Sequence, residues 1–333
     1  MMEQRVSEAD FARLTGPFRR ELTAHCYRMT GSAHDAEDLV QETYLRAWRS
    51  IAGFEQRSSL RVWLYRIATN VCLTALEHRS RRDLPAGLGG PSDDPERPLT
   101  VAGPEISWVE PLPGTATATD PASIVADRGS VRLALVAALQ HLPATQRAVL
   151  ILRDVLSWRA AEVADLLGTT PDAVHSTLAR ARAQLRRAGV DEDTLSEPPP
   201  GDHRVLLEQY ATAFANADVD ALLRLLRDDV ALEMPPHLTW FAGRAAVGRF
   251  FDASVFAEMG PIHLVPASSG GEPAFGSYHR TADGHWTAHA LQVLTVTPAG
   301  VARIVAFVGA SLFASFGLAT IIPAAEVTDV PRA

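Results

Sequence analysis

The sequence predicts a multidomain chain in which two all-helical domains precede a C-terminal α+β domain. Apolar residues recur at three- and four-residue steps through residues 8–82 and 122–187, which is the period of amphipathic helices. Short apolar runs separated by glycine-containing turns follow in residues 203–320 and are typical of antiparallel strands. Two acidic, proline-containing stretches, 83–121 and 188–202, separate the three parts.

The first helical part combines aromatic and basic side chains around its third predicted helix, which Ser58 or Ser59 is expected to cap. Trp63 lies close to Arg61 and Arg66, a mixture that suits stacking on unpaired bases and holding a nucleic-acid backbone. The alternative for Trp63 is a place in the helical core. Acidic residues at the start of the preceding helix can match the helix dipole or form a docking surface for a basic partner.

Residues 83–121 hold eight Pro and five Gly in 39 positions, with seven acids against one Arg. Such a proportion of Pro and Gly without a period predicts a disordered linker. Residues 188–202, with five acids around Pro198, predict a second linker.

The second helical part predicts a helix-turn-helix. A short helix ends at Gly168, and Thr170 caps a second helix whose first residue is Pro171. Short polar side chains near the start of the second helix can approach base edges, whereas the alternative is an ordinary surface helix with scattered arginines. The apolar stripe expected to face the core comprises Val174, Leu178, Ala181 and Leu185.

The C-terminal part predicts two helices first and then an antiparallel meander, with a tail at 321–333. Asp283-Gly284 between strand-like runs is a strong hairpin signal. The stretch Ile304–Ala325 carries no charge over 22 residues and is long enough to span a membrane. Small and polar residues within it favour instead a buried strand followed by a tail.

The net charge of −8 is unevenly divided, and every basic residue is an arginine. Residues 1–82 carry +3 and residues 122–187 carry +4, whereas the linkers carry −6 and −5 and the C-terminal part −4. Basic helical modules on acidic tethers fit DNA binding. Cys26 and Cys72 alone exclude a disulfide-stapled scaffold and an all-cysteine zinc site, and the charged first residues do not suit a signal peptide.

The order of these motifs resembles a bacterial sigma-70 family factor of the extracytoplasmic-function type (group 4). The resemblance rests on Asp38–Glu42, on the segment Phe54–Asn70, on Leu142–Leu150 and on the helix-turn-helix ending at Arg182. It implies that residues 8–82 are sigma region 2 and that residues 122–187 are region 4. His175 and Thr177 depart from the family pattern, because many relatives carry Lys or Arg there, and the linker is longer than usual.

In that family the acidic helix docks on the clamp coiled coil of core RNA polymerase, and region 4 contacts the flap. Region 2 captures flipped bases of the −10 promoter element, and the region 4 recognition helix reads the −35 element. The residues so implied are, for polymerase, Asp35, Asp38, Leu39, Gln41 and Glu42; for the −10 element, Phe54, Arg57, Ser58, Ser59, Leu60, Arg61, Trp63, Arg66 and Asn70; and for the −35 element, Arg159, Thr170, Asp172, His175, Ser176, Thr177, Arg180, Arg182 and Arg186.

Residues 203–318 resemble the SnoaL-like branch of the nuclear transport factor 2-like superfamily, a cone of curved sheet and helices. The resemblance rests on four segments, and it implies a domain that regulates the factor, with an anti-sigma factor or a small ligand as a further partner. The segments are Tyr210–Phe214, Asp220–Leu223, Trp240–Phe250 and Phe313–Leu318, and the expected cavity residues are Tyr210, Trp240, Asp252, His263 and Trp286. The resemblance also implies that Val301–Phe313 is the last buried strand, with Ala314–Ala325 as the tail after it.

Two other functions compete with this interpretation. Relatives of the C-terminal fold include isomerases and cyclases, but no pairing among Glu233, Asp252 and the histidines indicates an acid–base site. On a strand, His285 and His289 would lie about 13 Å apart at ~3.3 Å per residue, too far to share one metal. A helix-turn-helix repressor would need neither polymerase docking nor single-strand capture. We therefore expect a cytoplasmic, non-enzymatic sigma factor without cofactor, metal or membrane span.

Overall fold

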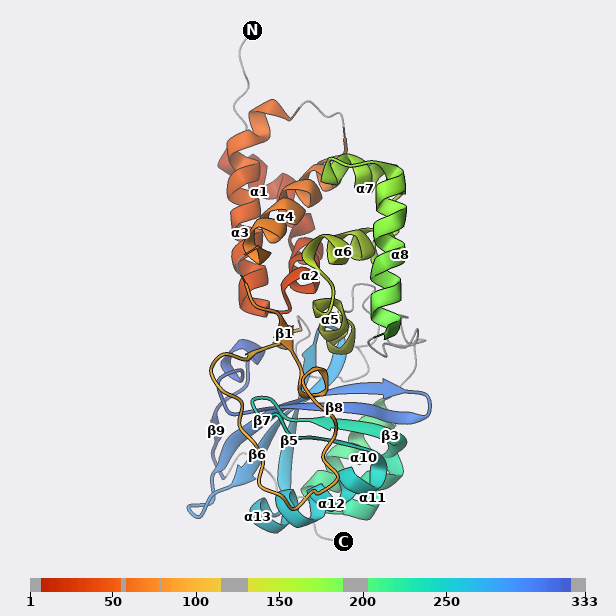
Figure 1. Cartoon of the computed structure of the whole chain (residues 1–333). Coiled ribbons are helices and arrows are strands. Elements are labelled where there is room, and N and C mark those ends of the chain that lie inside the picture. The colour runs from red at the N-terminus through yellow and green to blue at the C-terminus, as the bar shows by residue number, and fades with distance from the viewer. Residues whose placement is uncertain (1–6, 55–57, 78, 115–130, 188–202, 325–333) are drawn as a thin grey trace. The chain divides into compact units, whose positions relative to one another are not determined.

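The computed structural model describes residues 7–54, 58–77, 79–114, 131–187 and 203–324. The chain forms two compact units (Figure 1). Unit 1 comprises residues 1–82 and 134–196, and unit 2 comprises residues 83–133 and 197–333. Among the described residues, no helix is long and apolar enough to cross a membrane.

The N-terminal part of unit 1 is helical, as predicted. Ser59 caps the fourth helix by accepting the Val62 N–H at 3.3 Å, which selects it over Ser58. Gly31 ends the second helix with φ +71°, a conformation that favours glycine. Its helices are α1 (Glu8–Thr15), α2 (Arg19–Thr30), α3 (Ala33–Ser50) and α4 (Leu60–Leu76), with 3₁₀ turns at Gly16–Phe18 and Ile51–Gly53.

The second part of unit 1 confirms the predicted helix-turn-helix. Gly168 ends the first helix of the motif with φ +65°, and the Thr170 hydroxyl accepts the Ala173 N–H at 3.2 Å. The four predicted stripe residues of the second helix are all buried. The helices are α5 (Leu133–Gln140), α6 (Ala144–Leu150) with a π-helical continuation at Ile151–Val155, α7 (Ala160–Leu167) and α8 (Pro171–Arg187).

Unit 2 is an α+β domain whose sheet has the order β4-β3-β8-β7-β6-β5, with β9 paired to β7. Helices follow one another before and between the first strands, and hairpins join β5 to β8, including the one predicted at Asp283-Gly284 (Figure 1). The parallel pairing of β3 with β8 was not predicted, since it joins segments distant in sequence. The elements are α10 (Arg204–Ala215), α11 (Val219–Leu225), β3 (Leu226–Glu233), β4 (Trp240–Ala242), α12 (Arg244–Phe250), a π-helical turn (Phe251–Phe256), α13 (Ala257–Met259), β5 (Ile262–Ser269), β6 (Glu272–Arg280), β7 (Trp286–Thr297), β8 (Gly300–Val308) and β9 (Ile321–Ile322).

The uncharged stretch near the C-terminus is a strand and a packed extension. The strand β8 ends at Val308, earlier than predicted, and Phe313 is fully buried. Beyond it, Ile322 of β9 pairs with Trp286, and the Tyr278 hydroxyl donates to the Ala319 carbonyl at 2.7 Å. The expected tail is therefore part of unit 2 as far as residue 324.

The predicted disordered linker is instead ordered over residues 83–114 and packs on the C-terminal domain. Its backbone pairs with both edge strands of the sheet: the Ser92 N–H donates to Trp240 of β4, and the Gly114 N–H donates to Ser268 of β5, each at 2.8 Å. Composition cannot reveal this pairing, because the partner groups are unpaired edges elsewhere in the chain. Residues 115–121 and the second predicted linker, 188–202, lie outside the described residues.

Candidate polymerase and promoter interfaces

One face of α3 presents acidic and apolar side chains together. Asp38 and Gln41 are exposed, and Glu42 is half-buried beside Arg46 at 2.7 Å. Leu45 and Trp48, 51% and 37% exposed, continue the same face at helical spacing. These two residues were not predicted from the sequence. Both are large apolar side chains outside the row of apolar residues by which α3 faces the helical core, and that position could have identified them.

Two of the predicted polymerase-binding residues are not on this surface. Leu39 is buried in the helical core. Asp35 is buried at the start of α3, where its carboxylate accepts Arg79 and, at 3.2 Å, Arg82. Of the predicted acidic residues, Asp35 is therefore an internal carboxylate paired with arginines, whereas Asp38 and Glu42 lie on the face that α3 exposes.

The residues predicted to capture the −10 element lie at the start of α4. The rings of Phe54 and Trp63 are tilted against each other with centroids 4.9 Å apart, and both are half-buried. Trp63 is thus not a core residue, whereas its neighbour Tyr65 is. Ser58, Ser59 and Asn70 are exposed and Leu60 is half-buried, while Arg57 lies outside the described residues.

The arginines of α4 are held by specific partners. Arg61 pairs with Glu21 at 2.7 Å, and its guanidinium lies 4.9 Å from the centre of the Tyr65 ring. The hydrogen bond that Arg61 donates to Glu21 raises the pKa of Arg61. Burial, with the Glu21 charge nearby, raises the pKa of Tyr65, which stays a neutral phenol.

Arg66 connects the two helical groups of unit 1. Its guanidinium pairs with the Asp165 carboxylate of α7 and donates to the Asp165 carbonyl at 3.0 Å. Tyr65, the residue before Arg66, also contacts the second helical group: the centroids of the Tyr65 and Trp158 rings are 5.4 Å apart. A residue predicted to contact the −10 element is therefore engaged by the helix-turn-helix.

The recognition helix α8 exposes a polar face. Arg180 donates to the Thr177 hydroxyl at 3.2 Å, and Arg182 makes a bidentate pair with Asp154 at 2.7 and 2.9 Å. This pair raises the pKa of Arg182. The remaining predicted −35 residues, all exposed, are Arg159, Thr170, Asp172, His175, Ser176 and Arg186.

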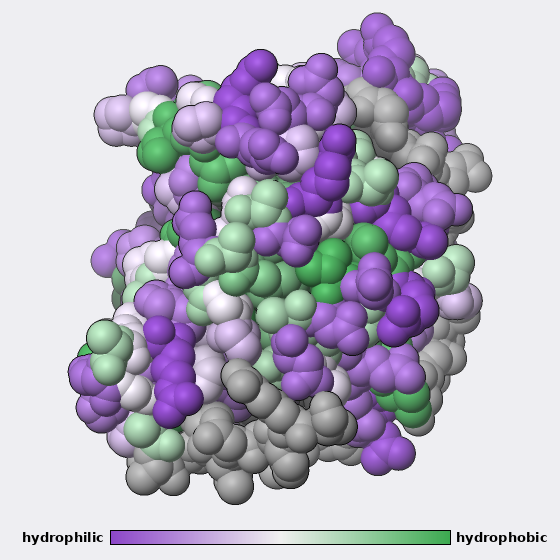
Figure 2. Space-filling model, turned by 90° about the horizontal axis from the view of Figure 1, so that it is seen from below, coloured by the Kyte–Doolittle hydropathy of each residue, from purple (hydrophilic) through white to green (hydrophobic). Residues whose placement is uncertain are grey.

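The structure does not bring the five predicted cavity residues together. Tyr210 is in the main core and donates to Gln292 at 2.8 Å, whereas Trp286 belongs to a separate apolar cluster, 5.5 Å from the His263 ring. Asp252 is exposed, and Trp240 donates to the Gly89 carbonyl at 2.9 Å. The face in Figure 2 is mostly hydrophilic, with apolar side chains in scattered groups.

One candidate acid–base group of unit 2 is engaged in a structural ion pair. Glu233 is fully buried and paired with Arg303. Burial lowers the pKa of His263, and burial together with His279 and His237 lowers the pKa of His289. Within the part of the chain that the structure describes, no three His, Cys, Asp or Glu side chains form a group that could hold a metal ion.

Comparison with known proteins identifies the architecture. Sigma-70 region 2 matches residues 15–82, Sigma-70 region 4 matches residues 132–185, and the Nuclear transport factor 2 (NTF2) domain matches residues 204–267. The chain is 51% identical over 312 residues to the ECF RNA polymerase sigma factor SigG of Mycobacterium tuberculosis, covering 93% of this chain and 84% of that protein. The chain belongs to the extracytoplasmic-function (ECF) sigma factor family.

A solved structure of the same family is similar to this chain in fold. The crystal structure of the ECF sigma factor SigJ of M. tuberculosis has 25% sequence identity and a TM-score of 0.59, covering 94% of this chain and all of that one. The predicted fold class is confirmed: helical sigma domains are followed by an NTF2-like α+β domain. As an ECF sigma factor, the protein directs RNA polymerase to promoters and initiates transcription.

Proposed function

We propose that the exposed face of α3 binds the clamp coiled coil of core RNA polymerase through Asp38, Gln41, Leu45 and Trp48. The observation that carries this is the pair of large apolar side chains exposed beside acidic ones. Exposed apolar groups rimmed by polar residues are typical of protein interfaces, and the acids add complementarity to a basic partner. Leu45→Arg should abolish binding of core polymerase, whereas Arg13→Ala on α1 should not; equal binding by both variants would contradict the assignment.

Promoter reading is assigned to two surfaces of unit 1. The Phe54–Trp63 pair and the exposed Asn70 suit capture of unstacked bases of the −10 element, because aromatic rings stack on any base. The exposed face of α8, from Asp172 to Arg186, suits the −35 element, with His175 and Ser176 nearest its N-terminus. Region 4 is also assigned to the polymerase flap. Ser176→Ala should change −35 preference, whereas Arg186→Ala should weaken binding to all promoters alike.

In unit 1, regions 2 and 4 are packed together, which we call the closed arrangement. This arrangement must open before Arg66 reaches DNA. Arg66 is paired with Asp165, and Tyr65 contacts Trp158 of the same helical group. Both partners belong to region 4, so a −10-reading residue is occupied by the domain that reads the −35 element. Binding to polymerase and promoter would release this contact at modest cost, because the side chains of Arg66 and Asp165 are 41% and 79% exposed.

The C-terminal domain is assigned a regulatory role through the segment that joins regions 2 and 4. At the beginning of this segment, the Ala86 N–H donates to the buried Glu233 carboxylate at 2.8 Å. Arg303 compensates the charge of Glu233 through one carboxylate oxygen, while the other oxygen accepts from Ala86 of the segment.

A second buried carboxylate binds the far end of the same segment. The Leu133 N–H donates to Glu272 at 2.7 Å, and Thr295 donates to its other oxygen at 3.0 Å. Next to it, the Val131 N–H donates to the Gly270 carbonyl at 2.6 Å. The segment is thus held at both ends by unit 2, which shortens the free tether between regions 2 and 4.

Release of this segment is the experiment that tests the regulatory role. Truncation after residue 197 should change transcription from a cognate promoter and widen the distribution of distances between Arg49→Cys on α3 and Arg186→Cys on α8, measured by fluorescence energy transfer. Full-length protein with the same labels is the control. An unchanged distance distribution and unchanged transcription would remove the role. The factor is expected to act in the cytoplasm, with an anti-sigma factor or small ligand as further partner.

A further inference from the structure

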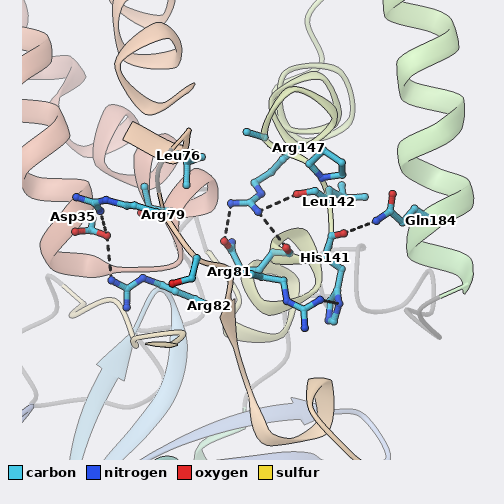
Figure 3. Close-up of a pocket in the computed structure, with 14 residues that line it drawn as sticks. Asp35, Leu76, Arg79, Arg81, Arg82, His141, Leu142, Arg147 and Gln184 are labelled. Atoms are coloured by element: carbon cyan, nitrogen blue, oxygen red, sulfur yellow. Dashed lines mark hydrogen bonds and ion pairs between the residues drawn. The ribbon is translucent and has the colours of Figure 1, made fainter. Parts of the chain in front are cut away.

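A basic pocket of about 320 Å³ lies within unit 1 (Figure 3). One wall comes from the end of α4 and the residues that follow it, and the other comes from the turn between α5 and α6. The two walls therefore belong to region 2 and region 4. Neither the promoter surfaces nor the α3 face uses this pocket.

The pocket has an excess of positive charge. Its described lining includes Arg79, Arg81, Arg82 and Arg147 but a single carboxylate, Asp35. Asp35 accepts from both Arg79 and Arg82, as Figure 3 shows. Arg81 donates to His141 Nδ1 at 3.1 Å.

Arg147 is the buried member of this group, with 5% of its surface exposed. It donates to the Met29 carbonyl, to Gln140 Oε1 at 2.7 Å and to the Leu142 carbonyl at 3.0 Å, all of them neutral oxygens. Its Nε has no hydrogen-bond partner among the described residues. Burial lowers the pKa of Arg147 to about 10, so the side chain is still a cation at neutral pH. A buried cation of this kind favours an anion beside it.

The rest of the lining suits an uncharged portion of a ligand. Leu76, Leu142, Pro143 and Ala144 are apolar, while Gln140 and Gln184 offer amide groups. The volume lies at the lower end of the ~300–1,000 Å³ range of small-molecule sites. Arginine forks bind both carboxylate and phosphate oxygens in pairs, but several arginines around one site suit a group with more than two acceptor oxygens, such as phosphate.

We propose that this pocket binds a phosphate-bearing small molecule of nucleotide size, with the phosphates at the arginines and the uncharged portion against Leu76, Leu142 and Pro143. Because both walls contribute, the ligand binds only when regions 2 and 4 are packed together. Binding therefore stabilises the closed arrangement of unit 1 by mass action.

Calorimetric titration of the full-length protein tests the proposal with GDP, ADP, inorganic pyrophosphate and guanosine as probes. At least one of the two nucleotides should bind saturably and raise the melting temperature, pyrophosphate should compete with it, and guanosine should not bind. Arg81→Ala should weaken binding at least about tenfold, because it removes a charged partner of the phosphate. The exposed Arg13→Ala, already paired with Asp10, is the matched control and should leave affinity unchanged.

Two results overturn the proposal: neither nucleotide binds at millimolar concentration, or Arg81→Ala binds the nucleotide as tightly as the Arg13→Ala control does. If neither nucleotide binds but pyrophosphate does, it is the assigned ligand size that is wrong. Duplex DNA of random sequence serves as a separate arm: loss of DNA binding in Arg81→Ala without nucleotide binding by the unaltered protein would assign these arginines to the DNA backbone instead.

Discussion

Buried charge is arranged differently in the two units, and the difference separates their roles. In unit 2 the buried Glu233 has Arg303 as a counter-charge, and the buried Glu272 has neutral donors from Leu133 and Thr295. In unit 1 the buried Asp35 is paired with Arg79 and Arg82, but the buried Arg147 has neutral acceptors around it and further arginines nearby. Unit 2 therefore uses buried charge to hold its own chain, whereas unit 1 keeps a positive excess that suits binding of anions.

The largest expected effect comes from breaking the compensated pair of unit 2. Glu233→Ala should lower the free energy of unfolding of unit 2 by about 3 kcal/mol, since it leaves Arg303 without its counter-charge and the Ala86 N–H without its acceptor. Urea unfolding measures the change. Glu233→Gln keeps an acceptor and should lose less; equal losses would show that the carboxylate charge is irrelevant.

His25 of unit 1 and Glu272 of unit 2 should contribute to the pH dependence of stability with opposite signs. His25 of unit 1 is fully buried, and this burial lowers its pKa from 6.5 to about 3. As the pH falls below 6.5, the unfolded chain takes up the proton first, so unit 1 loses about 1.4 kcal/mol per pH unit, and this contribution is complete only above pH 6.5.

In unit 2, burial raises the pKa of Glu272 above 4.5, so the folded state takes up the proton first and gains stability as the pH falls through that pKa. Hydrogen exchange followed by fragment separates the two units. His25→Gln should flatten the pH dependence of unit 1 alone; an unaltered slope in that variant would contradict the assignment.

A smaller effect is expected where the joining segment touches the β5–β6 turn. Gly270 has φ +57°, and an added Cβ would lie 2.4 Å from the Val131 carbonyl oxygen. Gly270→Ala should therefore cost about 1–2 kcal/mol and detach the end of the segment at Val131. Gly53→Ala, where a Cβ meets nothing within 4 Å and φ is not positive, is the control. The measurement is urea unfolding together with exchange of the Val131 N–H.

The smallest change in stability is expected for Asp165→Ala in unit 1. The pair with Arg66 is largely exposed and should contribute less than about 1 kcal/mol. Promoter affinity should nevertheless rise, because Arg66 becomes free to contact DNA. Filter binding to a promoter fragment measures this, with Glu37→Ala, at an exposed acid outside the proposed DNA surfaces, as a control of equal charge. A weaker or unchanged affinity in Asp165→Ala would argue against the closed state as a restraint.

The helices of unit 1 and the hairpins of unit 2 could be predicted because their signals are local. The stripe from Val174 to Leu185 and the turn at Asp283-Gly284 depend on spacing alone. The ordered segment 83–114 could not be predicted, since its partners, such as Trp240 and Ser268, are more than a hundred residues away. Asp35 was misassigned to the surface for the same reason: its partner arginines follow α4.

Backbone hydrogen exchange at the two ends of the joining segment tests the central claim, that unit 2 holds this segment through Glu233 and Glu272. In the full-length protein, exchange should be slow for the Ala86 and Leu133 N–H groups. Glu233→Ala should accelerate exchange at Ala86, and Glu272→Ala should accelerate it at Leu133, each with little effect on the other end. Exchange as fast as in an unprotected peptide at both positions of the unaltered protein would contradict the claim.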